Sequence, residues 1–292
     1  MQYEGTLYRP PSEARSLIIQ ATIGCAHNTC TFCNMYLGKK FRIRKTEEII
    51  ADIEEAAFSR YASYIDRVFL ADGDALVMPT ERLLEILRAV KGLLPQVKRV
   101  TSYGTAQDVL RKTDEELKLL YENGLDMVYL GAESGDDEIL KAVKKDMTAD
   151  EMAEAGQKLK KSGILCSVTF ISGLGGKEMI EAHAMKSALL TNRMQPAYAS
   201  FLTLQIVEGT PMYEDLRSGR FQRITTEECV KEMQTYLSHV DSEGTVFRMN
   251  HASNCFRLAG TLNVDIPAMQ KVLSEVESGE RYARRMGEIE VL

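Results

Sequence analysis

The sequence predicts an α/β fold, a partial (β/α)6 barrel of the TIM type with a small α-rich C-terminal extension. Short apolar segments recur along about the first 210 residues, and a polar turn follows each of them. Helix-like segments lie between these apolar segments. The apolar segments lack strict alternation, which is typical of strands buried on both faces of a parallel sheet. Strands that alternate with helices in this way form right-handed βα units.

Six segments are predicted as strands because each is rich in Val, Ile, Leu, Tyr or Phe. A full barrel has eight βα units in about 250 residues, so six units predict a partial barrel. The predicted strands are residues 17–23, 67–71, 99–103, 126–131, 165–172 and 198–207.

Helix signals lie between these segments. Residues 46–60 place their apolar side chains on one face, as an amphipathic helix does. Pro79 suits the first turn of another helix, where its missing N–H costs nothing. Three Thr-x-x-Glu capping boxes mark further helix starts, because the hydroxyl and the carboxylate satisfy free N–H groups of the first turn. They are Thr113 with Glu116, Thr148 with Glu151, and Thr225 with Glu228.

Residues 1–215 are predicted to form the barrel core, and residues 216–292 an extension that covers the barrel mouth. The tail has a helix pattern at about 226–239, a strand-like GTVFRM, an irregular NHASNCFRLAGTLN and a helix from Pro267. No linker rich in Pro, Gly or Ser separates it from the core. We therefore expect the extension to be a lid on one domain.

The composition excludes several classes of protein. The chain has 292 residues, of which 45% are hydrophobic and 27% charged, so disorder, collagen and coiled coil are poor interpretations. It has no apolar run near the roughly 18 residues of a membrane span and no signal-peptide core at its start, so we expect a cytoplasmic protein. A net charge of −6 gives no overall electrostatic attraction to a phosphate backbone. The charge therefore disfavours nucleic acid and favours a small-molecule substrate.

The cysteines point to a metal site. The chain has six, too few for a disulfide scaffold, yet Cys25, Cys30 and Cys33 fall in one segment spaced C-x4-C-x2-C. Three thiolates on one loop suit an iron–sulfur cluster or zinc. A structural zinc ion needs four ligands, and His27 is the local candidate for the fourth. A zinc-binding protein and an electron-transfer iron–sulfur protein are therefore the alternatives to an enzyme whose cluster keeps one iron open.

Other predicted strands also end in polar or glycine-rich turns. In α/β barrels the carboxyl ends of the strands share one face, and that face carries the chemistry. We therefore expect these turns to surround the cysteine loop. They are residues 72–74, 102–104, 131–135 and 172–176.

These residues resemble the radical S-adenosylmethionine (SAM) superfamily, most closely its branch with an Elp3-like or coproporphyrinogen-dehydrogenase-like core. The resemblance covers about residues 17–215. It rests on the cysteine loop with Phe32 before its last cysteine, on GAESG followed by DDEILKAVKKDMT, and on VTFISGLGG. Most members have the spacing C-x3-C-x2-C, whereas this chain has one more residue between Cys25 and Cys30.

The resemblance implies a 4Fe–4S cluster held by Cys25, Cys30 and Cys33, with SAM chelating the fourth iron. It also implies a reductant such as flavodoxin or ferredoxin. Reductive cleavage of SAM then gives a 5′-deoxyadenosyl radical that takes hydrogen from a small or medium organic substrate. The cofactors supply the reactivity, and the protein supplies position and shelter from water.

The resemblance also implies SAM contacts at two strand ends. Asp72, Gly73 and Asp74 occupy the place of the motif that binds the methionyl amino group, and a carboxylate there suits an ammonium group. Glu133 and Ser134 occupy the place of contacts to the methionine or ribose end. The competing structural interpretations are an Asx turn for the two aspartates and a helix cap for Glu133.

The remaining candidates are less specific. Gly173 and Gly175 either let the backbone approach the adenine or simply form a turn. Phe32 either stacks near the adenine or packs in the core. Cys255 is a candidate to return a hydrogen atom to a product radical, against the alternative of a buried structural cysteine.

Two further features lie in or near the cysteine loop. His27 and Asn28 either hydrogen-bond a cluster sulfide or face solvent. The basic run at residues 39–45 either meets an anionic substrate or is a solvated surface segment.

Overall fold

The structure is a computed structural model that describes residues 1 and 3–284. The chain divides into two compact units, and the cysteine loop contributes to both. The first unit comprises Met1–Asn28, Met35–Leu130 and Lys158–Cys166, and the second comprises Thr29–Asn34, Gly131–Gln157 and Ser167–Leu292.

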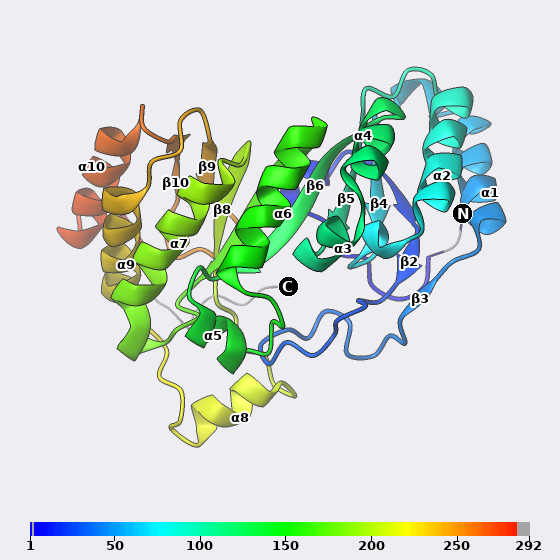
Figure 1. Ribbon diagram of the computed structural model, residues 1–292. Coiled ribbons are helices and arrows are strands. Elements are labelled where there is room, and N and C mark those ends of the chain that lie inside the picture. Colours follow the sequence, from blue (N-terminus) through cyan, green and yellow to red (C-terminus); the bar gives the residue numbers. More distant parts are fainter. Residues whose placement is uncertain (2, 285–292) are drawn as a thin grey trace. The chain divides into compact units, whose positions relative to one another are not determined.

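The first unit is built on parallel strands (Figure 1). Their registers pair Gln20 with Ala71 and Leu70 with Ser102, so their carboxyl ends lie at one edge. The order is β1 (Leu17–Gln20), β4 (Arg67–Ala71), β5 (Arg99–Gly104) and β6 (Leu125–Glu133), whose last three residues belong to the second unit.

Helices cover this sheet. Helix α1 packs on α2, and α2 packs on α4 (Figure 1). Ile49 and Ile53 of α1 are fully buried, as the amphipathic pattern predicts. The helices are α1 (Thr46–Ala57), α2 (Thr80–Leu93), α3 (Ala106–Arg111) and α4 (Asp114–Glu122), with short 3-10 turns η1 (Pro11–Glu13), η2 (Ala62–Tyr64) and η3 (Ala75–Val77).

The second unit also has a mostly parallel sheet. Strands β7 (Leu165–Ser172), β8 (Tyr198–Thr203) and β9 (Val246–Met249) run parallel, and β10 (Leu258–Thr261) is antiparallel to β9. Helix α9 packs on both α7 and α10 (Figure 1). The helices are α5 (Asp137–Ala142), α6 (Ala149–Ser162), η4 (Lys177–Met179), α7 (Ile180–Met194), α8 (Pro211–Arg217), α9 (Thr226–His239) and α10 (Ile266–Glu277), of which α6 ends in the first unit.

The structure confirms the six predicted strands but moves some of their bounds. The first predicted strand is broken, because Thr22–Ile23 (β2) pairs in antiparallel fashion with Arg42–Ile43 (β3) instead of continuing β1. The last predicted strand ends at Thr203. The expectation of an irregular stretch after Asn250 was wrong in part, because that stretch contains β10.

All three predicted capping boxes are present. The Glu116 and Glu228 carboxylates accept from the N–H groups of Thr113 and Thr225, and the threonine hydroxyls accept in return. Thr148 and Glu151 exchange the same two bonds. A fourth box, Thr105 with Asp108, was not predicted because its carboxylate is an aspartate.

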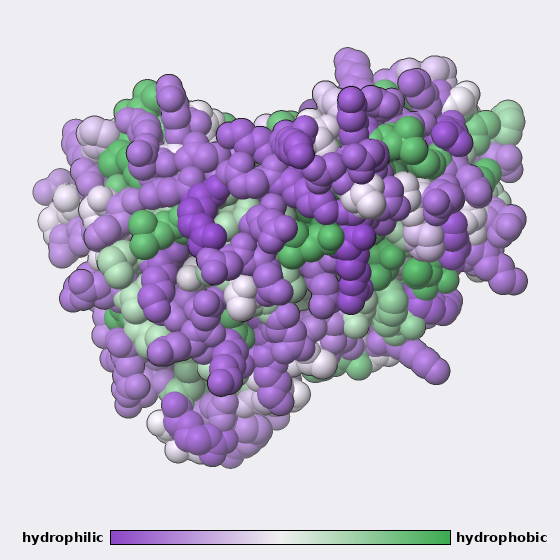
Figure 2. Space-filling model, in the orientation of Figure 1, coloured by the Kyte–Doolittle hydropathy of each residue, from purple (hydrophilic) through white to green (hydrophobic). Residues whose placement is uncertain are grey.

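The surface is polar with scattered apolar residues. The face in Figure 2 shows apolar side chains in separate small groups among hydrophilic ones. None of the helices within the described residues is long and apolar enough to cross a membrane. The boundary predicted between residues 215 and 216 stays a prediction.

Candidate active site

Cys25 lies at the carboxyl end of β2, beside the turn that follows β4. The Gly24 N–H donates to the Asp72 carboxylate at 3.2 Å, and the Gly73 N–H donates to the Gly24 carbonyl at 3.2 Å. A Cβ atom on Gly73 would lie 2.7 Å from the Tyr36 ring and 3.1 Å from the Cys25 Cβ. Gly73 therefore permits the close approach of the cysteine loop to this turn, and a larger residue would push Cys25 away.

Cys30 and Cys33 are fixed through Thr31, one of the two residues between them. The Thr31 N–H donates to the Val143 carbonyl, and the Thr31 carbonyl accepts from the Met212 N–H, both at 3.0 Å. The Cys33 N–H donates to the Cys30 carbonyl at 3.2 Å, which makes a tight turn. Like Cys25, both cysteines are partly exposed. Backbone hydrogen bonds thus hold this half of the loop to the second unit.

The three thiols do not form a ready metal site. Among residues 1 and 3–284, no three His, Cys, Asp or Glu side chains gather closely enough to hold a metal ion. Thiolate ligands come together as a metal binds, because site and metal stabilise each other. The expected convergence of Cys25, Cys30 and Cys33 on one centre therefore stays a prediction.

The Asp72 carboxylate is a buried hydrogen-bond acceptor at the strand ends of the first unit. Its side chain is fully buried, and its Oδ2 accepts from Lys39 Nζ at 2.7 Å and from Gln20 Nε2 at 3.0 Å, as well as from Gly24. Within the described residues the Asp72 carboxylate accepts no hydrogen bond from its own turn, so the Asx-turn interpretation was wrong for Asp72. The ion pair with Lys39 instead ties the turn to the segment after the cysteine loop. One carboxylate oxygen thus organises this edge.

Several other buried polar atoms at this edge lack partners. Asp72 Oδ1 has no hydrogen-bond partner within the described residues, and neither do the hydroxyls of Thr22 and Ser102. All three side chains are at most 1% exposed. Buried polar groups are nearly always satisfied by protein, water or a ligand. The edge therefore suits a ligand with polar groups.

Asp74 is buried and begins the turn η3 without capping it through its side chain. The basic run nearby is mostly engaged in ion pairs. Lys39 pairs with Asp72, Arg42 with Glu4 and Arg44 with Asp52. These pairs compensate the charges of Lys39, Arg42 and Arg44, and the hypothesis that the run meets an anionic substrate stays a prediction. Asn28 likewise donates to the Tyr36 carbonyl at 3.1 Å, a local bond within the loop.

Glu133 ends β6 with a positive φ of 63°. Its carboxylate pairs with Lys145 at 2.8 Å, and both side chains are largely buried. The helix-cap interpretation was wrong, because Asp136 caps α5 by accepting from the Glu138 N–H. Ser134 is fully buried, and its hydroxyl accepts from the Asp136 N–H at 3.0 Å.

The turn after β7 is tightly packed. Gly173 has a φ of 81°, and a Cβ atom there would lie 3.0 Å from the Ile224 side chain. A Cβ atom on Gly175 would lie 2.7 Å from Ile139. Phe32 packs against the apolar cluster that contains Ile139, so packing describes its present contacts. Packing alone already explains why glycine occupies positions 173 and 175.

A buried network in the second unit was not predicted. Glu232 of α9 is 1% exposed, and its carboxylate accepts from His183 Nδ1 at 2.8 Å, from the Gly173 N–H at 3.1 Å and from the Ser172 hydroxyl. His183 Nε2 lies 3.3 Å from the Glu133 carbonyl oxygen. One carboxylate and one imidazole thus hold the ends of β6 and β7 to helices α7 and α9.

The sequence carries one signal for this network. Glu232 lies on the apolar face of α9, between Cys229 and Tyr236, where a charged side chain needs a buried partner. The partner itself is 49 residues away in the chain, so only the fold identifies His183.

The three other cysteines are buried. Burial raises the pKa of the Cys166 thiol to about 12, so it is a core residue. Cys229 and Cys255 hydrogen-bond each other, which raises the pKa of Cys229 and lowers the pKa of Cys255. The Cys229 sulfur also lies 3.2 Å from the Ser172 hydroxyl. Cys255 is therefore a polarised thiol, unlike Cys166.

A family model described as the radical SAM superfamily matches residues 19–188, which is more than half of the chain. The chain belongs to the radical SAM superfamily. Its cofactors are therefore a 4Fe–4S cluster and SAM, and membership does not favour the zinc-binding or electron-transfer alternatives. Radical SAM enzymes bind small-molecule substrates and need a reductant.

Three known proteins show how far the likeness extends. The chain is 26% identical over 199 residues to an uncharacterized methyltransferase of Pyrococcus horikoshii, covering 68% of this chain and 41% of that protein. The archaeal Elp3 of Methanocaldococcus infernus matches with a TM-score of 0.53 and 18% identity, covering 80% of this chain and 59% of that one. Methylornithine synthase matches with a TM-score of 0.54 and 17% identity, covering 92% and 83%.

These likenesses define the fold of the radical SAM chain. The two solved structures support the predicted α/β partial barrel. The chain spans about two fifths of the length of the Pyrococcus horikoshii relative. The chemistry of the donor set fits the cofactors, because three partly exposed thiols suit a cluster and the buried Asp72 Oδ1 offers an acceptor to an ammonium group.

Proposed function

We propose that this protein cleaves SAM reductively and begins radical chemistry on a small or medium organic substrate. The observation that carries the proposal is the loop of Cys25, Cys30 and Cys33 after β2, in a chain that the superfamily model matches. When bound, the two cofactors supply a 5′-deoxyadenosyl radical for hydrogen abstraction. The chain's own part is to hold them, to orient SAM and to exclude water.

In this proposal Cys25, Cys30 and Cys33 are the cluster ligands. Their backbone anchors support the role, because hydrogen bonds at Gly24 and Thr31 fix the loop on either side of the extra residue. The longer C-x4-C spacing then changes the path of the loop and leaves the number of thiols at three.

The SAM contacts follow the strand ends. Asp72, Gly73 and Asp74 are proposed at the methionyl amino group, supported by the unpartnered Oδ1 of Asp72. Glu133 and Ser134 are proposed at the methionine or ribose end. The carboxylate of Glu133 already pairs with Lys145. Glu133 therefore contacts SAM either through its backbone or by giving up the ion pair with Lys145.

Gly173, Gly175 and Phe32 are proposed at the adenine. The turn is rigid, since the Gly173 N–H is fixed by Glu232 and both glycines pack against side chains. A rigid turn without side chains permits close approach of an aromatic base. Phe32 already packs beside this turn in the cluster of Ile139 and Leu174.

Residues 1–215 are proposed as the barrel core and residues 216–292 as an extension over its mouth. The Asn254 side chain supports this, because it donates to the Phe201 carbonyl and to the Thr203 hydroxyl at the carboxyl end of β8. Cys255 follows directly and is the proposed hydrogen-atom donor to a product radical.

The partners and location complete the proposal. The reductant is a flavodoxin or ferredoxin, and the net charge of −6 favours a small molecule over nucleic acid as substrate. The location is the cytoplasm, because its reducing conditions keep cysteine thiols available as ligands.

The experiment is anaerobic reconstitution with iron and sulfide, followed by dithionite and SAM. The expected product is 5′-deoxyadenosine, measured by liquid chromatography. A matched control is Cys166→Ala, which changes a buried cysteine without a proposed metal role and should leave the product unchanged. Absence of 5′-deoxyadenosine from a fully reconstituted protein would contradict the proposal.

A further inference from the structure

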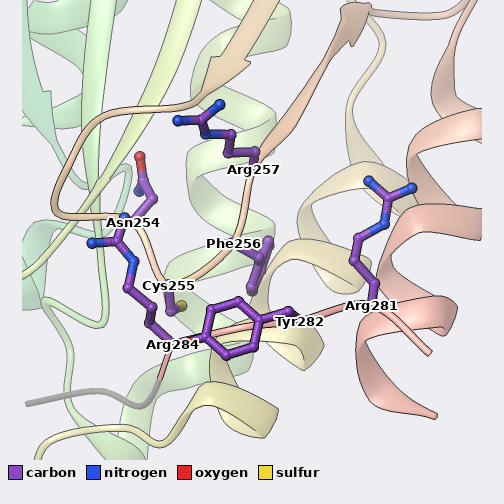
Figure 3. Close-up of a pocket in the computed structure, with 7 residues that line it drawn as sticks. All are labelled: Asn254, Cys255, Phe256, Arg257, Arg281, Tyr282 and Arg284. Atoms are coloured by element: carbon purple, nitrogen blue, oxygen red, sulfur yellow. The ribbon is translucent and has the colours of Figure 1, made fainter. Parts of the chain in front are cut away.

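A pocket of about 260 Å³ lies in the second unit, beside the loop after β9 (Figure 3). Three of its lining residues are arginines, and no acidic residue lines it among those that the structure describes. Figure 3 shows Arg257, Arg281 and Arg284 placed around Cys255 and Phe256. This concentration of positive charge stands out in a chain whose net charge is −6.

The pocket walls are fixed by backbone and buried side chains. Asn254 is 2% exposed, and its amide donates to Phe201 and Thr203 at 3.1 and 3.3 Å. The Arg284 N–H donates to the Cys255 carbonyl at 2.8 Å, and the Arg284 carbonyl accepts from the Thr226 hydroxyl at 3.0 Å. The two lining segments are therefore held together without their arginine side chains.

The three arginines differ in their ion pairs. Arg281 pairs with Glu275 at 2.8 Å, so its charge is largely compensated. Among residues 1 and 3–284, no ion pair joins Arg257 or Arg284 to an acidic side chain. Guanidinium groups bind carboxylate and phosphate through paired N–H donors. Arg257 and Arg284 thus have donors available to an anion in the pocket.

We propose that this pocket binds a small oxyanion, a carboxylate or a phosphate group, through Arg257 and Arg284. A volume of about 260 Å³ has room for a carboxylate or phosphate group and is below the roughly 300–1,000 Å³ of sites for drug-sized ligands. Because Asn254 joins the pocket to the carboxyl end of β8, the face that carries chemistry in α/β barrels, the oxyanion is the anionic group of the substrate. Only the identification of the oxyanion as part of the substrate rests on the proposed function.

Cys255 provides a direct probe of the pocket. Cys255 lines the cavity with 3% of its surface exposed, and hydrogen bonding from Cys229 lowers its pKa, which favours the reactive thiolate. Iodoacetate and iodoacetamide alkylate a thiolate by the same displacement of iodide but differ in charge. A positive pocket therefore raises the ratio of the iodoacetate rate to the iodoacetamide rate at Cys255, measured by peptide mass spectrometry.

The variants Arg257→Gln and Arg284→Gln should each lower this rate ratio by about threefold, as expected for a partly screened charge. Both side chains are exposed, so the fold is retained. Arg281→Gln is the matched control and should change the ratio much less, because Glu275 already compensates Arg281. Equal effects of all three variants, or no effect of any, would overturn the proposal.

Inorganic phosphate and malonate identify the oxyanion. The anion that the pocket prefers should slow alkylation of Cys255 at millimolar concentration, and the double variant Arg257→Gln/Arg284→Gln should abolish this protection. Protection that survives in the double variant, or no protection by either anion, would overturn the site. The assay needs neither cluster nor SAM, so a failure of 5′-deoxyadenosine release in the wild type would contradict the proposed function and leave the oxyanion site standing.

Discussion

Two buried carboxylates, one in each unit, hold strand ends in different ways. Glu232 uses both oxygens, accepting from His183, Ser172 and the Gly173 N–H. Asp72 uses only Oδ2, on which Lys39, Gln20 and the Gly24 N–H converge, while Oδ1 has no partner within the described residues. A fully satisfied carboxylate is a structural clamp, whereas a half-satisfied one keeps an acceptor for a ligand. The difference predicts that Glu232 positions the strand ends, whereas Asp72 binds a ligand.

Removing the satisfied carboxylate should have the largest effect on stability. Glu232→Ala leaves the Gly173 N–H, the Ser172 hydroxyl and His183 buried without an acceptor, so the free energy of unfolding should fall by about 3–5 kcal/mol. Urea unfolding followed by circular dichroism measures this. Lys231→Ala, an exposed change on the same helix, should stay within about 0.5 kcal/mol. A loss of unfolding free energy no larger for Glu232→Ala than for Lys231→Ala would show that Glu232 is not a structural clamp.

Removing the cation beside Asp72 comes next. Lys39→Met leaves a fully buried carboxylate without its counter-ion, and the expected loss of unfolding free energy is about 3 kcal/mol. The double variant Lys39→Met/Asp72→Asn should recover at least half of that loss, because it removes both charges. Lys40→Met, next to it and exposed, is the control. A double variant less stable than Lys39→Met would show that the ion pair is not the main interaction.

For SAM affinity the order of the two carboxylates should be reversed: changes at Asp72 should matter more than changes at Glu232. The double variant Lys39→Met/Asp72→Asn should raise the Kd for SAM about tenfold, the loss of one hydrogen bond to a charged group. Glu232→Gln keeps an acceptor for Gly173 and should change the Kd by less than about threefold. Equilibrium dialysis with the reconstituted protein measures both. Equal changes in Kd would mean that Asp72 has no special part in binding.

Asp126 is a partly buried carboxylate. Replacing it should change the free energy of unfolding less than replacing Glu232 or Lys39. Burial raises its pKa, although its carboxylate accepts from the Val100 N–H at 2.8 Å. Below the ordinary pKa of 3.8 both folded and unfolded states are protonated, and the penalty develops as the pH rises through the folded pKa.

Asp126→Asn should therefore stabilise the protein at pH 7 by up to about 1 kcal/mol, a modest gain because the side chain is partly exposed. The gain should vanish near pH 3. Urea unfolding of variant and wild type at both pH values measures it. A gain that persists at pH 3 would show that charge burial is not its cause.

The sequence predicted those features that depend on residues close together in the chain. The cysteine spacing, the three Thr-x-x-Glu boxes and the polar turns at strand ends are each readable within a few residues. Local hydrogen bonds decide such features, so the structure has helix starts at Thr113, Thr148 and Thr225 as predicted. Strand β10 was missed because its four residues include a glycine and an alanine, which have weak strand preference.

Non-local pairing was not predictable from the sequence. Lys39 reads as one member of a basic surface run, yet the fold places it on Asp72, 33 residues away. His183 meets Glu232 across 49 residues. In both cases the residue types suggest only that a partner is needed, and the choice of partner depends on which strands and helices become neighbours.

One measurement decides whether the cysteine loop is the radical SAM centre. Anaerobically reconstituted wild type, Cys25→Ala, Cys30→Ala, Cys33→Ala and Cys166→Ala are reduced with dithionite, and their electron paramagnetic resonance spectra are recorded before and after addition of SAM. The wild type and Cys166→Ala should show a cluster signal that changes with SAM, and the three loop variants should lack it. An undiminished, SAM-responsive signal in any loop variant would contradict the assignment of that cysteine as a ligand.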